Sequence, residues 1–119
     1  MRVFKTSRFA KDARKAHIGD AELCQAIDQV VKGQCDDLGG GVFKKRLDKN
    51  RYRSIILAKG GKLWIYEYLF AKKDRDNIDE GELAGFRQLA KAYEGLIERQ
   101  LSQLLQDRHL VEICHVEET

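Results

Sequence analysis

The sequence predicts a single α+β domain over residues 1–119, built on a mostly antiparallel sheet with helices on one face. Three observations support this fold class. The chain has 119 residues, of which 43% are hydrophobic, so it can bury one core, and it has no proline to interrupt helices or strands. Its first part has the apolar spacing of helices, its middle alternates as strands do, and its last part returns to helical spacing. The expected order is β-α-α-β-β-β-α, with an N-terminal helical hairpin and a C-terminal helix.

The N-terminal part is expected to form one strand and two helices. Residues 2–5 alternate between polar and apolar side chains, which indicates a short first strand. Apolar residues then recur on one face of residues 8–16 and 21–33, and the short break between these helices favours an antiparallel hairpin. Residues suited to cap the two helices precede them: Thr6 or Ser7 for the first, and Asp20 for the second. The apolar stripe of the second helix consists of Leu23, Ile27, Val30 and Val31.

The middle of the chain predicts an antiparallel meander of three strands. Residues 42–47 alternate, residues 51–58 are apolar enough for a central strand, and residues 62–70 are rich in aromatic and β-branched side chains. Two glycines, Gly60 and Gly61, indicate a hairpin turn between the last two strands.

The C-terminal part predicts a long helix followed by a tail. Asp79, with Glu82 three residues later, is typical of a helix N-terminus. Gly95 is a weak point where the helix can bend or stop. Residues 107–119 are expected to be a C-terminal tail, and the apolar part of this tail either forms a short strand or stays extended.

The cysteines and histidines favour a cytoplasmic protein without a metal ion or other cofactor. Cys24, Cys35 and Cys114 are isolated, and three cysteines cannot all pair, so a reducing compartment is expected. No apolar run resembles a signal peptide or reaches membrane-spanning length, so no membrane association is expected. His109 and His115 have no matching ligands elsewhere at the spacing of a zinc site.

The densest positive charge lies inside the predicted meander. The net charge is only +3, yet six of the ten residues from 44 to 53 are Lys or Arg. Lys44 and Arg46 are two apart on one strand and therefore share a face, and Arg53 opens the neighbouring strand. Further cations follow the third strand: Lys72, Lys73 and Arg75. A meander can gather these side chains into one phosphate-binding site; the alternative is a solvated edge strand whose lysines prevent aggregation.

Three motifs in this element order resemble the RelE/ParE superfamily of toxins from bacterial toxin–antitoxin pairs, and its HigB-like branch more closely. Ribosome-dependent RelE toxins carry a K-x-K or K-x-R strand, then Y-R at the start of the next strand, then a G-K-R-E-R-like turn. The corresponding stretches are "KKR" at 44–46, "YR" at 52–53 and "AKKDR" at 71–75. The resemblance covers about residues 1–100.

The resemblance implies a ribosome-dependent mRNA endonuclease with a cognate antitoxin as its partner. Such toxins cut mRNA in the ribosomal A site by attack of a ribose 2′-hydroxyl, and they use no metal. Carried over by position, Lys44 and Arg46 lie near the scissile phosphate, Arg53 stabilises it, and Lys73 is an acid or electrostatic stabiliser. The neighbouring residues expected to bind RNA are Lys45, Arg51, Tyr52, Lys72 and Arg75.

Two other functions stay open on the same fold. Lys73 stands where the RelE turn has arginine, and Asp79 falls where some RelE toxins have a catalytic tyrosine. A toxin of the ParE kind acts on DNA gyrase and lacks the catalytic basic set. A binding module would have kept the fold and lost the activity.

Overall fold

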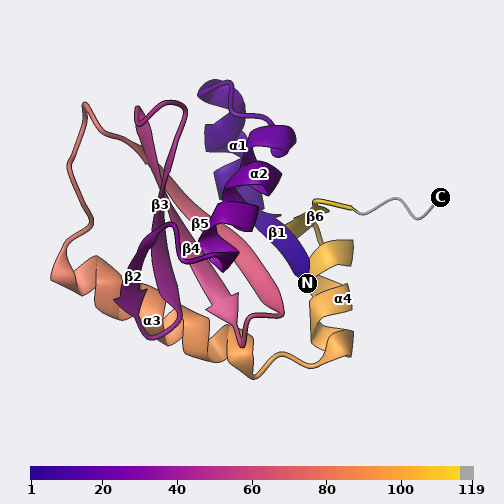
Figure 1. The fold of residues 1–119 in the computed structure, drawn as a ribbon. Coiled ribbons are helices and arrows are strands. Elements are labelled where there is room, and N and C mark those ends of the chain that lie inside the picture. Colours follow the sequence, from indigo (N-terminus) through magenta and orange to yellow (C-terminus); the bar gives the residue numbers. More distant parts are fainter. Residues whose placement is uncertain (116–119) are drawn as a thin grey trace.

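The computed structural model describes residues 1–115, which form one six-stranded sheet and four helices. The sheet order is β2-β3-β4-β5-β1-β6 (Figure 1). The elements in chain order are β1 (Arg2–Thr6), α1 (Ser7–Lys15), α2 (Asp20–Val31), β2 (Asp36–Gly39), β3 (Val42–Leu47), β4 (Tyr52–Lys59), β5 (Leu63–Ala71), α3 (Glu80–Glu94), α4 (Glu98–Gln106) and β6 (Leu110–Ile113). The predicted α+β class and the antiparallel meander of β3, β4 and β5 are confirmed.

The first strand pairs in a way that the sequence did not reveal. β1 runs parallel to β5, with Arg2 opposite Leu63 and Lys5 opposite Tyr66. β5 continues to Ala71, whereas β1 ends at Thr6 and the chain turns directly into α1. The last residues of β5 therefore have no strand neighbour on that side within residues 1–115, which leaves a free edge.

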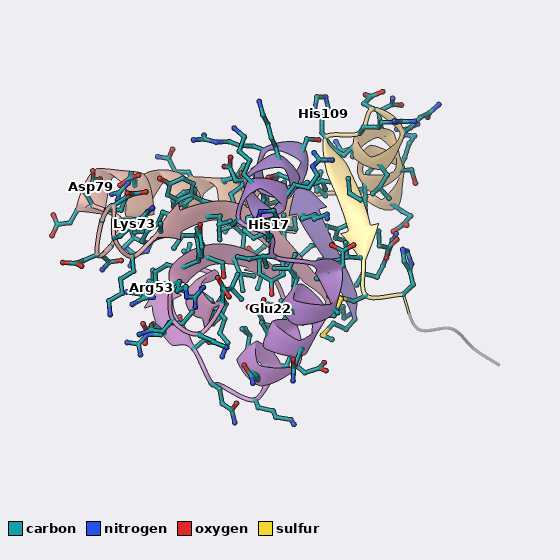
Figure 2. The ribbon with its side chains drawn as sticks, turned by 90° about the horizontal axis from the view of Figure 1, so that it is seen from above. His17, Glu22, Arg53, Lys73, Asp79 and His109 are labelled. Carbon is teal, nitrogen blue, oxygen red and sulfur yellow. A yellow bond between two sulfur atoms is a disulfide. The ribbon has the colours of Figure 1, made fainter. Side chains whose placement is uncertain are left out.

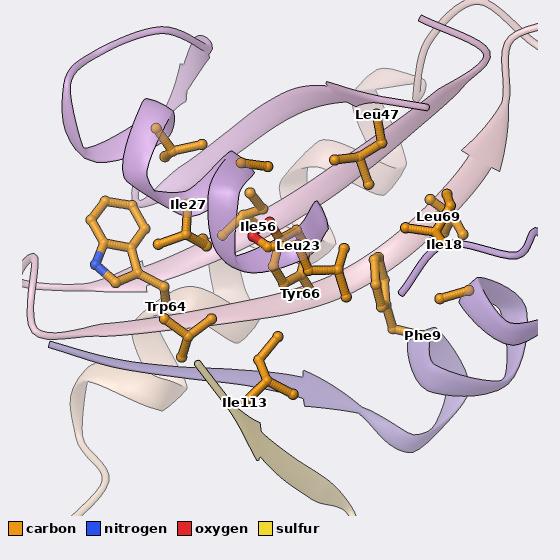
Figure 3. Close-up of a cluster of buried hydrophobic side chains, with 14 of the residues drawn as sticks. Phe9, Ile18, Leu23, Ile27, Leu47, Ile56, Trp64, Tyr66, Leu69 and Ile113 are labelled. Carbon is orange, nitrogen blue, oxygen red and sulfur yellow. Dashed lines mark hydrogen bonds between the residues drawn. The ribbon is translucent and has the colours of Figure 1, made fainter. Parts of the chain in front are cut away.

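Helices cover both faces of the sheet, so the prediction of a single covered face is wrong. α1 and α2 pack on one face, where Leu23 and Ile27 meet Trp64 and Tyr66 (Figure 3). α3 and α4 pack on the other face, on which the buried side chains include Val42, Ile55, Leu57, Phe70, Ala90, Phe4, Ile65 and Leu101. Three consecutive residues of β4, Ile55–Leu57, are at most 1% exposed. Such a continuous apolar run is typical of a strand that is buried on both faces, so the sequence did contain an indication that both faces are covered.

The caps of the two N-terminal helices were predicted with mixed success. Thr6 caps α1, and its Oγ1 accepts a hydrogen bond from the Phe9 amide at 3.0 Å, as expected. Asp20 does not cap α2, because it is the first helical residue and Gly19 occupies the cap position. The Asp20 carboxylate instead accepts a hydrogen bond from Lys5 Nζ at 2.7 Å. Val31 is 52% exposed and does not belong to the buried stripe of α2.

The C-terminal helical segment begins and divides at the predicted residues. Asp79 and Glu82 form a reciprocal capping box at the start of α3. Gly95 ends this helix, so the predicted weak point separates α3 from α4. The short strand β2 was missed, because Asp36 and Asp37 make its first half polar and exposed.

The segment after α4 forms an edge strand and not a loose extension. β6 pairs antiparallel with β1, and its residues Leu110 and Ile113 are each 3% exposed.

Cys114 follows β6 and forms a disulfide with Cys24 of α2, with their Cα atoms 5.4 Å apart. The expectation that the cysteines are isolated is therefore wrong for two of the three; Cys35 is free. A separation of 90 residues hides this pair from the sequence, since only the packing of α2 over the sheet brings them together. Within residues 1–115, no helix has the length and apolar character needed to cross a membrane.

Candidate functional site

Several of the predicted cations, among them Arg51, Lys72 and Lys73, lie where the β3–β4 turn meets the segment that follows β5. The amide of Lys72 donates a hydrogen bond to the carbonyl of Arg51 at 2.8 Å, which joins the two segments. The turn itself contains three non-glycine residues with positive φ, at 50°, 52° and 73°: Asp48, Lys49 and Asn50. Figure 2 shows Arg53 and Lys73 towards the same side of the molecule, in the view from above.

Lys44, Arg46 and Arg53 share one face of the sheet, as predicted. Arg46 and Arg53 are register partners across β3 and β4, and Phe70 is the partner of Arg53 on β5. Val42, Lys44 and Arg46 are spaced two apart on β3, so their side chains point to the same face of the sheet. Val42 packs in the cluster of buried side chains that α3 covers. These cations therefore lie on the face that α3 covers farther along the strands.

Arg53 is the most buried of the predicted cations, at 7% exposure. Its Nη1 donates to the carbonyl of Asn50 at 2.8 Å and to that of Tyr52 at 3.3 Å. The guanidinium thus braces the β3–β4 turn from inside. No carboxylate within residues 1–115 forms an ion pair with it, so the protein does not neutralise its positive charge.

The two predicted side chains of β3 have different surroundings. Lys44 lies 3.6 Å from a carboxylate oxygen of Asp36 and 3.3 Å from the side-chain oxygen of Asn77. Its partner Asp36 belongs to β2, the strand that the sequence did not predict. Arg46 is exposed and forms no ion pair in the part of the chain that the structure describes. It is therefore the freer of the two cations.

The structure does not bring Lys45 to the same place. Lys45 alternates to the opposite face, where its Nζ donates to the Gln34 carbonyl at 2.8 Å. Tyr52 also lies on that face and packs half-buried against the α1–α2 core. Arg51 is exposed, with Asp48 at 3.9 Å. Tyr52 and Arg51 still border the site because they flank the turn.

Arg75 serves as an anchor between the β5–α3 loop and the start of α3. Its guanidinium binds both carboxylate oxygens of Glu82, lies 5.6 Å from the centre of the Phe70 ring, and donates to the Asn77 carbonyl at 3.0 Å. The hydrogen bonds from Arg75 lower the pKa of Glu82 to about 2. With its donors used in this way, Arg75 is less available for the RNA contact that the sequence suggested.

The Arg75–Glu82 pair predicts a specific pH dependence of stability. Because the pKa of Glu82 is lowered from 4.5 to about 2 on folding, its stabilising effect is complete above pH 4.5 and is lost as pH falls towards 2. We expect Glu82→Gln to lower the free energy of unfolding at pH 7, and the difference from the wild type to shrink towards pH 2. Urea unfolding at both pH values measures this. Glu80→Gln is the matched control, since Glu80 is exposed in the same helical turn; an equal effect of both variants would contradict the prediction.

A groove of about 460 Å³ runs between α1 and the free edge of β5. It exists because β1 ends before β5 does. Its lining includes the cations Arg8, Lys15, Lys73 and Arg75, the carboxylates Asp12 and Asp74, and the aromatic residues Tyr52, Tyr68 and Phe70. The guanidinium of Arg8 lies 5.6 Å from the centre of the Tyr68 ring. Arg8 and Lys15 were not among the predicted site residues, because the groove depends on the parallel pairing of β1 with β5, which the sequence does not reveal.

A second hollow, of about 540 Å³, adjoins the first at the tip of the β3–β4 turn. It is lined by Lys49, Asn50, Arg51, Tyr52, Ala71, Lys72, Lys73 and Asp76. The two hollows share Tyr52, Ala71 and Lys73. Lys73 is exposed and has no ion pair within residues 1–115, so it lies at their common border with a free ammonium group.

The histidines do not add a metal site to this surface. Cys114, which lies beside His115 in the sequence, is consumed by the disulfide. Across residues 1–115, no three side chains of His, Cys, Asp or Glu are grouped so that they could hold a metal ion.

Comparison with known proteins assigns the chain to a family. Residues 1–113 match the family model described as the RelE toxin of the RelE/RelB toxin–antitoxin system. Neither the curated proteins nor the solved structures gave a significant match. The matched region runs from the first strand through β6, and so includes every helix and strand described above. The chain therefore belongs to the RelE toxin family.

Proposed function

We propose that this toxin is a ribosome-dependent mRNA endonuclease. The observation that carries the proposal is the gathering of Arg51, Lys72 and Lys73 at the junction of two turns, directly beyond the buried Arg53. Clustered cations next to an aromatic side chain, here Tyr52, suit the backbone and bases of a single RNA strand.

The proposed reaction needs no cofactor. A ribose 2′-oxygen attacks the adjacent phosphorus, a new P–O bond closes a 2′,3′-cyclic phosphate, and the bond to the 5′-oxygen breaks. The 2′-hydroxyl loses a proton to a base, and the leaving 5′-oxygen gains one from an acid. Negative charge builds up on the phosphorane in between, and fixed positive charges that meet it contribute much of the acceleration.

Arg53 and Lys73 are the residues best suited to that charge. Arg53 is held in place by the Asn50 and Tyr52 carbonyls, so its position does not have to be established when RNA binds. Lys73 is exposed and has no ion pair within residues 1–115, so its ammonium group can approach the leaving oxygen from the open side. Arg46 lies beside Arg53 on the neighbouring strand and adds positive charge, and Lys44 lies one row farther from the turn.

One observation favours the alternative of an inactive binding module. Arg75, which lines the groove, is already bound to Glu82, and Lys44 is close to Asp36. These pairs reduce the positive charge that meets an RNA phosphate. No contact within residues 1–115 favours the gyrase-directed alternative.

Expression from an inducible promoter separates the three functions. We expect the incorporation of labelled amino acids to stop within minutes, while DNA synthesis continues, and primer extension to map new 5′ ends within translated codons. An SOS response with DNA damage would point to the gyrase-directed function. Healthy growth with the protein present would point to the binding module.

Membership of the family implies an antitoxin as partner. We propose that this antitoxin covers the cationic end of the sheet, because an acidic segment there would neutralise the cations that bind RNA. A cytoplasmic location follows from the same proposal, since the ribosome is the site of action.

A further inference from the structure

We propose that α1 supplies a second wall of the RNA site, in which Arg8 and Lys15 hold the phosphate backbone of a single-stranded RNA segment lying in the groove along β5. This inference deepens the proposed function and rests on it for the identity of the ligand. It adds two contacts that neither the sequence motifs nor the family match assigns.

The spacing of the two side chains suits an extended strand. Lys15 follows Arg8 by seven residues, which is two turns of helix, so both lie on one side of α1. They are about 10 Å apart along the helix axis. Both line the groove with Lys73 on its other wall, so each can hold a different phosphate of one strand.

Both cations are available to a ligand. Neither Arg8 nor Lys15 forms an ion pair within residues 1–115. Arg8 is exposed, but its guanidinium is supported by the Tyr68 ring at 5.6 Å. It also borders a smaller hollow of about 230 Å³ that contains Glu67, whose pKa is raised by burial and held down in part by the Arg8 charge. A supported guanidinium loses less conformational freedom on binding than a free one.

The aromatic side chains that line the groove suit the bases of a nucleotide. Tyr52 and Tyr68 present aromatic surface to the groove, on which bases can stack. Asp12 lies between the two cations on the helix and is half-buried in the same wall. Its negative charge repels a phosphate, so the proposal predicts that removing this charge strengthens RNA binding.

Binding of an uncleavable RNA tests the proposal independently of catalysis. The probe is a fluorescein-labelled single-stranded RNA with 2′-O-methyl riboses, titrated by anisotropy at 0.1 M salt without ribosomes. A single-strand phosphate contact releases about 0.7 of a counterion, so we expect Arg8→Ala and Lys15→Ala each to raise Kd about fivefold and to reduce the salt slope by about 0.7. Asp12→Asn should lower Kd, and Arg8→Lys should keep most of the affinity.

Lys11→Ala is the matched control, since Lys11 is exposed on the same helix and does not line the groove. Thermal melts of all variants exclude a loss of folding as the cause. The proposal is overturned if the groove variants bind like Lys11→Ala, or if the wild type does not bind the probe. A wild type that binds through α1 but cuts no mRNA would instead overturn the proposed endonuclease function and leave the RNA groove in place.

Discussion

Replacement of Arg53 by alanine should reduce mRNA cleavage on translating ribosomes about a hundredfold, because a lost charge-assisted contact to the transition state commonly costs about 3 kcal/mol. Arg53→Lys should restore only part of the rate. The ammonium group of lysine cannot hold two phosphate oxygens as the planar guanidinium does. The rate is measured by primer extension in a single-turnover experiment with saturating toxin.

Arg53→Ala should also destabilise the protein, since the carbonyls of Asn50 and Tyr52 lose a buried donor. We expect a loss of about 1 kcal/mol in the free energy of unfolding. This loss is small enough for the variant to stay folded, so assays well below its melting temperature separate catalysis from stability. A variant that is destabilised but cleaves at the wild-type rate would show that Arg53 only braces the turn.

The controls distinguish a positioned charge from total charge. Lys73→Ala should slow cleavage as well, because Lys73 lies free at the border of the two hollows. Arg99→Ala removes one exposed positive charge from α4 and should leave the rate unchanged. Arg8 is unsuitable as this control, because it lines the groove beside Lys73. Equal losses for Arg53→Ala and Arg99→Ala would mean that only net charge counts.

The local parts of the fold could be predicted because their causes are local. Alternation placed β3, helical spacing placed α1 and α2, and the interplay of Asp79 with Glu82 marked the start of α3. Gly95 ended that helix, as expected from its low helix propensity. The polar strand β2 was missed because its pairing with β3, rather than its composition, makes it a strand.

The site was also predicted only in part, because some of its features follow from local strand positions and others from contacts between distant parts of the chain. Positions on neighbouring strands follow from register, so the shared face of Lys44, Arg46 and Arg53 was accessible from the sequence. The burial of Arg53 and the pairing of Arg75 with Glu82 were not, since they depend on loop conformation. The α1 wall was missed because it requires the parallel docking of β1 beside β5, a contact between distant parts of the chain.

The disulfide is the other feature that depends on distant contacts, and it conflicts with the expectation of a reducing compartment. Cys24 lies in α2 and Cys114 directly follows β6, so the bond ties a helix to an edge strand. Thiols are kept reduced in the cytoplasm, where ribosomes work. A toxin that acts there must therefore remain folded and competent without the bond.

We expect reduction of the Cys24–Cys114 disulfide to produce the largest stability change in this protein. Closing a loop of 90 residues restricts the unfolded chain, and in the chain-entropy model this is worth about 4–5 kcal/mol. For a domain of this size, such a loss lowers the melting temperature by more than about 10 °C. Thermal unfolding with and without a reducing agent measures the shift.

Two variants make this stability test specific. Cys35→Ser removes the free thiol and should melt like the wild type under both conditions. The double variant Cys24→Ser with Cys114→Ser should melt like the reduced wild type and should not respond to the reducing agent. An unchanged melting temperature of the wild type on reduction would show that the bond contributes nothing.

The reduced protein should nevertheless keep its affinity for the uncleavable RNA at 20 °C. The cysteines contact the core between the sheet and the α1–α2 pair, whereas Arg8, Lys15 and Lys73 lie outside that cluster of buried residues. β1 still pairs with both β5 and β6, so the sheet edge that frames the groove does not depend on the bond. If reduction weakens RNA binding while the protein stays folded, the disulfide holds α1 against the groove, and the toxin would be active only in its oxidised form.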